Sequence, residues 1–70
     1  MIRLKLWRLQ QGFTQERAAR WIGISESSYA MLESGRLRPT PGQMDRLRRR
    51  FGEGTDMLFH AVRDRVAAIP

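Results

Sequence analysis

The chemistry for which this sequence is best equipped is the binding of anions by arginine side chains. Of its 70 residues, 13 are Lys or Arg and 7 are Asp or Glu, so the formal net charge is +6. Lys5 is the single lysine, and arginine therefore supplies almost all of the positive charge. A guanidinium group can donate parallel N–H bonds to a phosphate or a carboxylate. This charge favours polyanionic partners, nucleic acid first and anionic membranes second, although a biased codon composition would also explain it.

Other kinds of chemistry lack the residues that they need. The chain contains no cysteine, and His60 is its one histidine, which excludes a disulfide framework and a metal site built on Cys or on a His cluster. We find no nucleophile beside a base, no paired carboxylates and no glycine-rich phosphate loop, so we expect neither an enzyme nor a cofactor. No apolar run is long enough to span a bilayer, and Lys5 and Arg8 interrupt a signal-peptide core. We therefore expect a cytoplasmic location and no membrane partner.

Two helix-start signals organise the middle of the chain. Thr14 and Ser25 lie eleven residues apart, and Gln or Glu follows each of them. Ser and Thr begin helices well because the side-chain oxygen accepts from a backbone N–H that has no helical partner. Gly23 can turn the chain between a helix over 15–21 and a second helix over 26–33. A short helix, a tight turn and a second helix form a helix-turn-helix, which commonly presents its second helix to the DNA major groove.

Helices are also expected on both sides of this unit. Residues 2–11 carry apolar side chains at helical spacing, although the alternation over 2–6 alone would suit a strand. Thr40 begins a later helix, with Pro at its first position and Gln43 three residues on to close a capping box. Gly52 ends that helix. The prediction is therefore helical throughout, with no sheet.

A fifth helix is predicted at the C-terminal end, over about 55–69. Its apolar positions recur every three or four residues and are Leu58, Val62, Val66 and Ile69. No linker or repeat divides the chain. The sequence therefore predicts a single all-α domain over 1–70, with a helix-turn-helix core at 14–35.

The ordered motifs of residues 4–59 resemble the lambda-repressor-like family, also called Cro or XRE regulators. The matching residues, in chain order, are Gly12, Thr14, Gln15, Ala19, Gly23, Ile24, Ser25, Leu32, Glu33, Gly35, Arg36, Arg38, Pro39, Leu47, Phe51 and Gly52. Each match alone is weak, whereas the complete set at the correct spacing is specific. The resemblance implies a five-helix domain that inserts residues 25–34 into the major groove of double-stranded DNA. It also implies a small transcriptional regulator, a repressor that binds two half-sites as a homodimer.

The resemblance assigns contacts with base edges to the outward face of the second helix of the motif. These residues are Ser25, Glu26, Ser27, Ala30, Met31 and Ser34. The face has no Arg, Lys, Gln or Asn, the residues that bond guanine or adenine bidentately. Glu26 can accept from the amino group of cytosine, and Ala30 and Met31 can contact a thymine methyl group. We therefore expect modest direct readout, with DNA shape contributing.

Contacts with DNA phosphates are expected at the starts of two helices and on the basic loop 36–39. These residues are Gln15, Arg17, Arg36, Arg38, Thr40 and Gln43. Helix N-termini favour anions through exposed N–H groups and the helix dipole, whereas the two loop arginines could equally form a solvated loop. Four further arginines follow at Arg46, Arg48, Arg49 and Arg50. For these four, a solvated face that complements the helix dipole is favoured over phosphate contact.

The resemblance also implies one structural ion pair and points to two unusual core positions. Arg8 and Glu33 match a pair that joins the first helix to the end of the recognition helix. Ala18 stands where a larger aliphatic residue is usual, and Tyr29 stands where Ile or Val is most common. We expect Tyr29 and Trp7 to fill the space that Ala18 leaves, because protein cores penalise voids.

Protein contacts are the remaining expectations. Residues for a possible dimer contact are Phe59, Val62, Val66 and Ile69. The alternative function is a protein-interaction module, or an antitoxin-type partner of another protein, that uses an apolar face made by Trp21, Ala30 and Met31. The two functions differ in salt dependence. DNA binding weakens steeply as the salt concentration rises, because the protein must release counterions from the phosphates.

Overall fold

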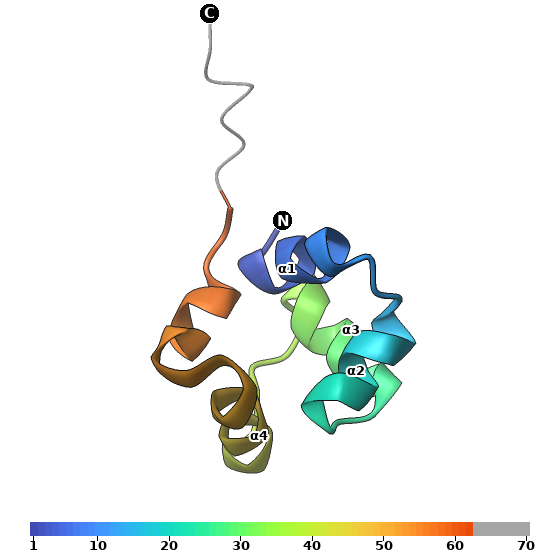
Figure 1. Ribbon diagram of the computed structural model, residues 1–70. Coiled ribbons are helices and arrows are strands. Elements are labelled where there is room, and N and C mark those ends of the chain that lie inside the picture. Colours follow the sequence, from blue (N-terminus) through green and yellow to red (C-terminus); the bar gives the residue numbers. More distant parts are fainter. Residues whose placement is uncertain (63–70) are drawn as a thin grey trace, which may run out of the picture.

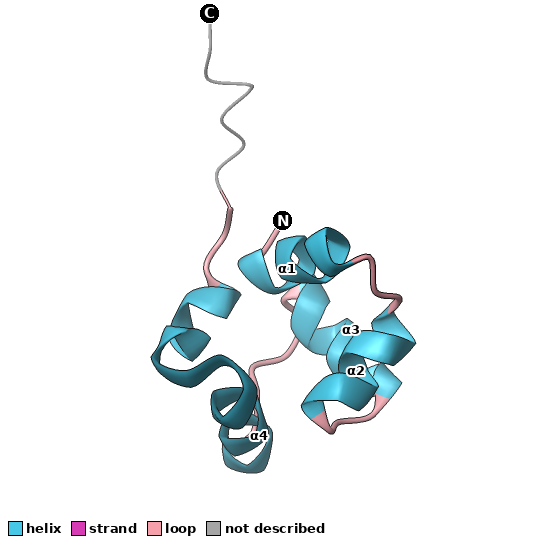
Figure 2. Cartoon of the chain, in the orientation of Figure 1, coloured by secondary structure: helices cyan, strands magenta, loops and turns pink. Residues whose placement is uncertain are grey.

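The computed structural model describes residues 1–62, which form a bundle of short helices (Figure 1). The four α-helices are α1 (Arg3–Gln11), α2 (Gln15–Ile22), α3 (Glu26–Ser34) and α4 (Pro41–Phe51), and a 3-10 helix, η1 (Gly52–Phe59), follows α4 directly. Residues 1–62 consist of helices and short loops and contain no β-strand (Figure 2). The predicted all-α class is confirmed.

The two helices of the central motif begin and end close to the predicted residues. The hydroxyl oxygen of Thr14 accepts from the backbone N–H of Arg17 at 3.1 Å, and that of Ser25 accepts from the N–H of Ser28 at 3.1 Å. Gly23 ends α2 with φ +97°, a left-handed conformation that strains any residue with a Cβ. These local signals explain why α2 and α3 pack together as a helix-turn-helix, joined by the turn at 23–25 (Figure 1).

The start of α4 contains the predicted capping box. The backbone N–H of Gln43 donates to the hydroxyl of Thr40 at 3.2 Å, and the N–H of Thr40 donates to the side-chain oxygen of Gln43 at 3.0 Å. Pro41 occupies the first helical position, where its missing N–H has no helical partner to lose. The helix therefore has a defined start immediately after the basic loop.

A single apolar core lies beneath the helices. Its buried residues are Leu4, Ala18, Ala19, Ile22, Tyr29, Leu32, Leu47 and Leu58. Full burial of a large apolar side chain stabilises a fold by about 1.5–3 kcal/mol relative to exposure. Ala18 and Tyr29 are both fully buried in this cluster, so a small and a large residue share the core.

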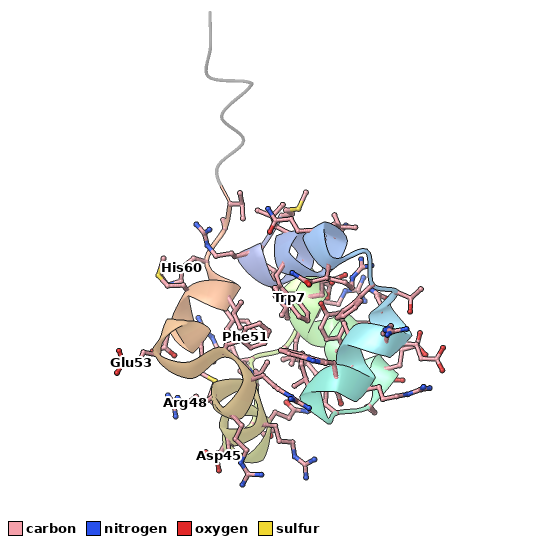
Figure 3. The ribbon with its side chains drawn as sticks, viewed as in Figure 1. Trp7, Asp45, Arg48, Phe51, Glu53 and His60 are labelled. Carbon is pink, nitrogen blue, oxygen red and sulfur yellow. The ribbon has the colours of Figure 1, made fainter. Side chains whose placement is uncertain are left out.

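Four aromatic side chains form a second layer beside the core. Trp7 of α1 has its ring centroid 4.9 Å from that of Phe51 and 5.3 Å from that of Trp21, and Phe13 lies 5.8 Å away. Trp7 and Phe51 point toward the centre of the molecule (Figure 3). The contacts of Trp7 with Phe13 and Phe51 are edge-on, as is that between Trp21 and Phe51, an arrangement that the aromatic quadrupole favours. The cluster joins α1, α2 and α4, and Trp7 packs from it against the buried core as a partly buried residue.

The helix predicted for about 55–69 is wrong within the described residues. Thr55, at which that helix was expected to begin, is 1% exposed, and its hydroxyl donates to the carbonyl of Gly52 at 2.6 Å inside η1. The 3-10 helix ends at Phe59, and His60 is already extended, with φ −83° and ψ 147°. Val66 and Ile69 lie outside the described residues.

Pairing with the N-terminus explains why no α-helix continues through residues 60–62. Ile2 and Ala61 form an isolated antiparallel bridge. The N–H of Arg3 donates to the carbonyl of His60 at 3.0 Å, and the N–H of Val62 donates to the carbonyl of Met1 at 2.7 Å. Because these backbone groups bond across the two ends of the fold, they are not available for hydrogen bonds within a helix. Thus η1 and the bridge, rather than a fifth α-helix, cover the N-terminal end of α1.

Candidate nucleic-acid interface

The outward face of α3 is the exposed surface of the central motif. Glu26, Ser27 and Ser34 are exposed, as is Ser25 at the N-cap, whereas Tyr29, Leu32 and Glu33 on the inward side are buried. Ala30 and Met31 are half-buried. The structure therefore places all six predicted base-facing residues on or beside one helix, with the polar residues more accessible than the apolar ones.

Two of the serine hydroxyls on this face already have partners within the protein. The hydroxyl of Ser25 donates to the hydroxyl of Ser28 at 2.9 Å while it accepts from the backbone of that residue. The hydroxyl of Ser34 donates to the carbonyl of Met31 at 2.9 Å. Within residues 1–62, the side chains of Glu26 and Ser27 make no such bond. These two side chains are consequently the best placed to meet an external polar group.

An ion pair fixes the C-terminal end of α3. Arg8 Nε donates to Glu33 Oε2 at 2.7 Å, and Arg8 Nη2 donates to Glu33 Oε1 at 3.1 Å. Arg8 Nη1 donates to the carbonyl of Phe13 at 2.9 Å, and Gln15 Nε2 donates to Glu33 Oε1 at 2.8 Å. The side chains of Arg8 and Glu33 are 13% and 4% exposed. One buried carboxylate therefore joins α1, the start of α2 and the end of α3.

The electrostatics of this network keep both partners charged. Burial alone would raise the pKa of Glu33, but the hydrogen bonds from Arg8 and Gln15 outweigh it and hold that pKa below its ordinary value. The hydrogen bond to Glu33 raises the pKa of Arg8, although burial acts in the opposite direction. A charged, bidentate pair holds its partners more rigidly than a single neutral bond.

Tyr29 lies beside this network in the core. Its side chain is fully buried, and its hydroxyl has no hydrogen-bond partner within the described residues. Burial first, and then the nearby carboxylate of Glu33, raise the pKa of Tyr29 above its ordinary value. The phenol is therefore neutral.

The predicted phosphate-binding arginines are exposed around the motif. Arg17 lies in the first turn of α2, with its guanidinium carbon 5.4 Å from the ring centroid of Phe13. Arg36 and Arg38 are exposed on the loop that follows α3. Gln15 differs, because its side-chain amide is engaged with Glu33. The structure thus leaves three exposed cationic side chains on α2 and the loop after α3, and it fixes the side chain of Gln15 at the N-terminus of α2.

At the start of α4, the side chains of Thr40 and Gln43 serve the capping box. Their polar atoms bond each other's backbone N–H groups. Two residues, Pro41 and Gly42, lie between them. Pro41 has no backbone N–H, so the N–H of Gly42 is the one that the capping box leaves free. The contribution of this helix start to anion binding would thus come from the dipole and the Gly42 N–H more than from the two side chains.

The four arginines of α4 are exposed, but two of them also bond backbone carbonyls of another element. Arg46 Nη1 donates to the carbonyl of Gly23 at 2.7 Å, and Arg50 Nε donates to the carbonyl of Trp21 at 2.8 Å. The Arg50 guanidinium carbon also lies 4.7 Å from the ring centroid of Trp21. Arg48 points to the outer side of α4 (Figure 3), where it lies 3.9 Å from a carboxylate oxygen of Asp56. Two of the four side chains therefore bind the C-terminal end of α2.

Sequence reasoning missed this connection between α4 and α2. The partner carbonyls lie 23 and 29 residues from the arginines in sequence. The signal that was available is the preference of arginine for the C-terminal carbonyls of a helix, but it was applied only to α4 itself. A pattern read along one helix cannot identify an acceptor on another.

Several of the residues proposed for protein contacts are engaged within the fold. Trp21 is half-buried in the aromatic cluster and covered by Arg50, while Ala30 and Met31 lie on α3. Phe59 packs against the core, and Val62 is held to Met1 through its backbone. Of the three residues that the alternative function uses, Trp21 is thus engaged by the fold, while Ala30 and Met31 remain partly exposed.

The described part of the chain contains neither a candidate metal site nor a helix that could span a membrane. Within residues 1–62, no group of three or more His, Cys, Asp or Glu side chains is arranged to hold a metal ion. In the same residues, every helix is too short or too polar to cross a bilayer.

Comparisons with known proteins agree with this geometry. A family model described as a helix-turn-helix domain matches residues 2–60. One curated relative is the SPbeta prophage-derived uncharacterized HTH-type transcriptional regulator YonR of Bacillus subtilis (strain 168), which is 34% identical over 57 residues. The alignment covers 81% of this chain and 53% of the relative, so the chain spans about half the length of that protein. No solved structure was found to match. With the family model covering nearly all of the described residues, the chain belongs to the helix-turn-helix domain family.

Proposed function

We propose that this chain binds double-stranded DNA in a sequence-specific manner as a small transcriptional regulator, a repressor, with residues 25–34 in the major groove. The observation that carries the proposal is the exposed outward face of α3, held in place by the ion pair of Arg8 and Glu33. A helix that is exposed on one face and fixed at its end can enter the groove without first being ordered. The helix-turn-helix family and the name of the relative, an HTH-type transcriptional regulator, support the same proposal.

Glu26 and Ser27 are the side chains that we assign to direct base readout. Both are exposed near the N-terminus of α3, and neither is engaged elsewhere in residues 1–62. A carboxylate accepts from the amino group of cytosine, and a hydroxyl can pair with any base. Ser25 and Ser34 would have to exchange an internal hydrogen bond for one to DNA. We therefore expect few bases in each half-site to be specified directly.

Positioning on the duplex falls to Arg17, Arg36 and Arg38. Their exposure leaves the guanidinium groups accessible to phosphate oxygens beside the recognition helix. Such contacts raise the affinity for every sequence and fix the register, but they carry no sequence information. The N-termini of α2 and α4 add favourable dipoles for the same anions.

The regulatory consequence would be exclusion of other proteins from the bound DNA. We propose a homodimer on an inverted repeat, since two-fold protein symmetry matches half-sites about one helical turn apart. The proposal includes a cytoplasmic location and no catalytic step.

Selection of bound fragments from a random DNA pool at physiological salt tests this function. Recovery of an inverted repeat with half-sites about 10 bp apart, centre to centre, is the expected result. Recovery of a single half-site would retain sequence-specific binding but contradict the homodimer. If no sequence is enriched and the protein binds no duplex at low salt, the function is not DNA binding.

A further inference from the structure

Three arginines surround a small recess on the side of α4 that faces α2. The recess is lined by Ile22, Arg46, Arg49 and Arg50, and we call it the arginine recess. No carboxylate is among its lining residues, so the three positive charges are not neutralised from within it. This concentration of like charge is unfavourable unless solvent or an anion offsets it.

Two of the three guanidinium groups are held in place by backbone carbonyls. Arg46 bonds the carbonyl of Gly23 at 2.7 Å, and Arg50 bonds the carbonyl of Trp21 at 2.8 Å while it stacks on the indole ring. Each group uses one nitrogen for that bond and keeps its other N–H donors for a further acceptor. A guanidinium fixed in this way loses less conformational entropy when it binds an anion.

Arg49 has a different character from its two neighbours. Within residues 1–62 it makes neither an ion pair nor a side-chain hydrogen bond, and it is exposed. Asp45 precedes it by one helical turn but does not line the recess, and no ion pair joins the two. The two bonded arginines are explained by the fold, because they satisfy carbonyls at the C-terminal end of α2. The position of Arg49 beside them is not explained by any contact of that kind.

The recess lies next to the N-terminus of the recognition helix. Gly23, which Arg46 bonds, precedes the N-cap Ser25 by two residues, and two residues of chain span at most about 7 Å. The major groove that would receive α3 is about 12 Å wide, so its phosphates lie within reach of groups beside the helix start. Arg36 and Arg38 follow the other end of the same helix, and the two sets of arginines therefore flank it along its length.

We infer that the arginine recess binds a phosphate of the DNA backbone beside the N-terminus of α3. This inference rests on the proposed function and extends it by a contact at the C-terminal half of α4. Arg46 and Arg50 supply fixed N–H donors, and Arg49 closes on the phosphate from the exposed side. The contact neutralises charge without reading sequence.

The test is the salt dependence of duplex binding by the full chain and by the variant Arg49→Gln. Arg49 is the appropriate position because it makes no contact in residues 1–62 that holds the fold together. Arg3→Gln is the matched control, since it removes the same charge from an exposed position in the first turn of α1. Thermal unfolding of all three proteins establishes that the fold is retained.

A phosphate contact predicts a specific change in the salt titration. Arg49→Gln should make the plot of log affinity against log salt shallower by about 0.9, and should weaken selected and scrambled duplexes by the same factor. Arg3→Gln should leave the slope within error of the unchanged chain. An unchanged slope in Arg49→Gln, or an equal change in both variants, would overturn the inference.

Three further results separate this inference from the proposed function and from membrane binding. If the unchanged chain binds DNA and only the Arg49→Gln slope fails to change, DNA binding stands and the recess has no part in it. If the unchanged chain binds no duplex at all, the proposed function itself fails. Loss of binding to anionic phospholipid vesicles in Arg49→Gln, with an unaltered DNA slope, would identify the recess as a membrane contact and reject a DNA phosphate.

Discussion

Arg8 and Glu33 form a bidentate ion pair across 25 residues of sequence, with nitrogen–oxygen distances of 2.7 and 3.1 Å. The pair fixes the end of α3 to α1, and Gln15 extends it to the start of α2. The elements that would contact DNA are therefore tied together by one carboxylate on the side away from the exposed face of α3. Its removal should affect both stability and the position of the recognition helix.

Arg8→Ala should destabilise the fold by about 3–5 kcal/mol, because it leaves the buried carboxylate of Glu33 without its charged partner. Arg20→Ala is the matched control. Arg20 pairs with Glu16 at 3.1 Å, but both side chains are exposed, so its loss should cost no more than about 1 kcal/mol. Urea denaturation measures both effects. Equal losses in the two variants would mean that the buried pair contributes no more than a surface pair.

The stability of the fold should decrease with acidity through Glu33. The pKa of this carboxyl lies below its ordinary value of 4.5 in the folded chain, so the unfolded chain takes up the proton first as the pH falls. The stabilisation is thus fully present above about pH 5 and is lost as the pH falls through the folded-state pKa. Urea midpoints between pH 7 and pH 3 should fall more steeply for the unchanged chain than for Glu33→Gln. Parallel curves would show that Glu33 does not contribute to the decline.

Gly23→Ala should destabilise the fold by about 1–2 kcal/mol, because φ at this position is +97° and an added Cβ strains the backbone there. Steric conflict is not the cause, since the nearest atom to that Cβ, Nη1 of Arg46, lies at 3.5 Å. Gly42→Ala is the control within the same chain. Gly42 is helical and its Cβ would meet nothing within 4 Å, so alanine should stabilise it by about 0.5–1 kcal/mol. The unfolding temperatures of the two variants should therefore shift in opposite directions from that of the unchanged chain. Shifts in the same direction would contradict this explanation.

Glu26→Gln should change the base preferred at one position of each half-site, because a carboxylate only accepts whereas an amide also donates. Repeating the selection from random DNA with the variant measures this change. Glu16→Gln alters an exposed carboxylate on α2 and should change overall affinity alone. An identical selected sequence for Glu26→Gln and the unchanged chain would remove Glu26 from base readout.

The parts of the fold that sequence could predict are those controlled by neighbouring residues. Thr14, Ser25 and Thr40 each accept from a backbone N–H three residues on, and Gly23 ends α2 in the conformation that glycine tolerates best. These interactions close within one turn of helix. Their signals are consequently complete in the local sequence, and the predicted bounds of α1, α2 and α3 are within one residue of the structure.

The parts that sequence could not predict depend on contacts between distant segments. The apolar spacing that begins at Leu58 suits an α-helix, but residues 60–62 bond the N-terminus instead. Likewise, Arg46 and Arg50 could be identified as cations and not as partners of α2. The residue types of the site could therefore be predicted from the sequence, whereas the positions of their side chains depend on how the helices pack.

The exposed face of α3 is the surface that we expect to contact DNA. The most direct test is backbone amide NMR of the isotope-labelled chain, titrated with a duplex recovered by selection. The largest chemical-shift changes should map to residues 25–34, with smaller changes at the start of α2 and over the loop 36–40. A scrambled duplex at the same salt should perturb the arginine-bearing positions more than Glu26 and Ser27. Changes that avoid α3 altogether, or that centre on Phe59 and Val62, would contradict the account.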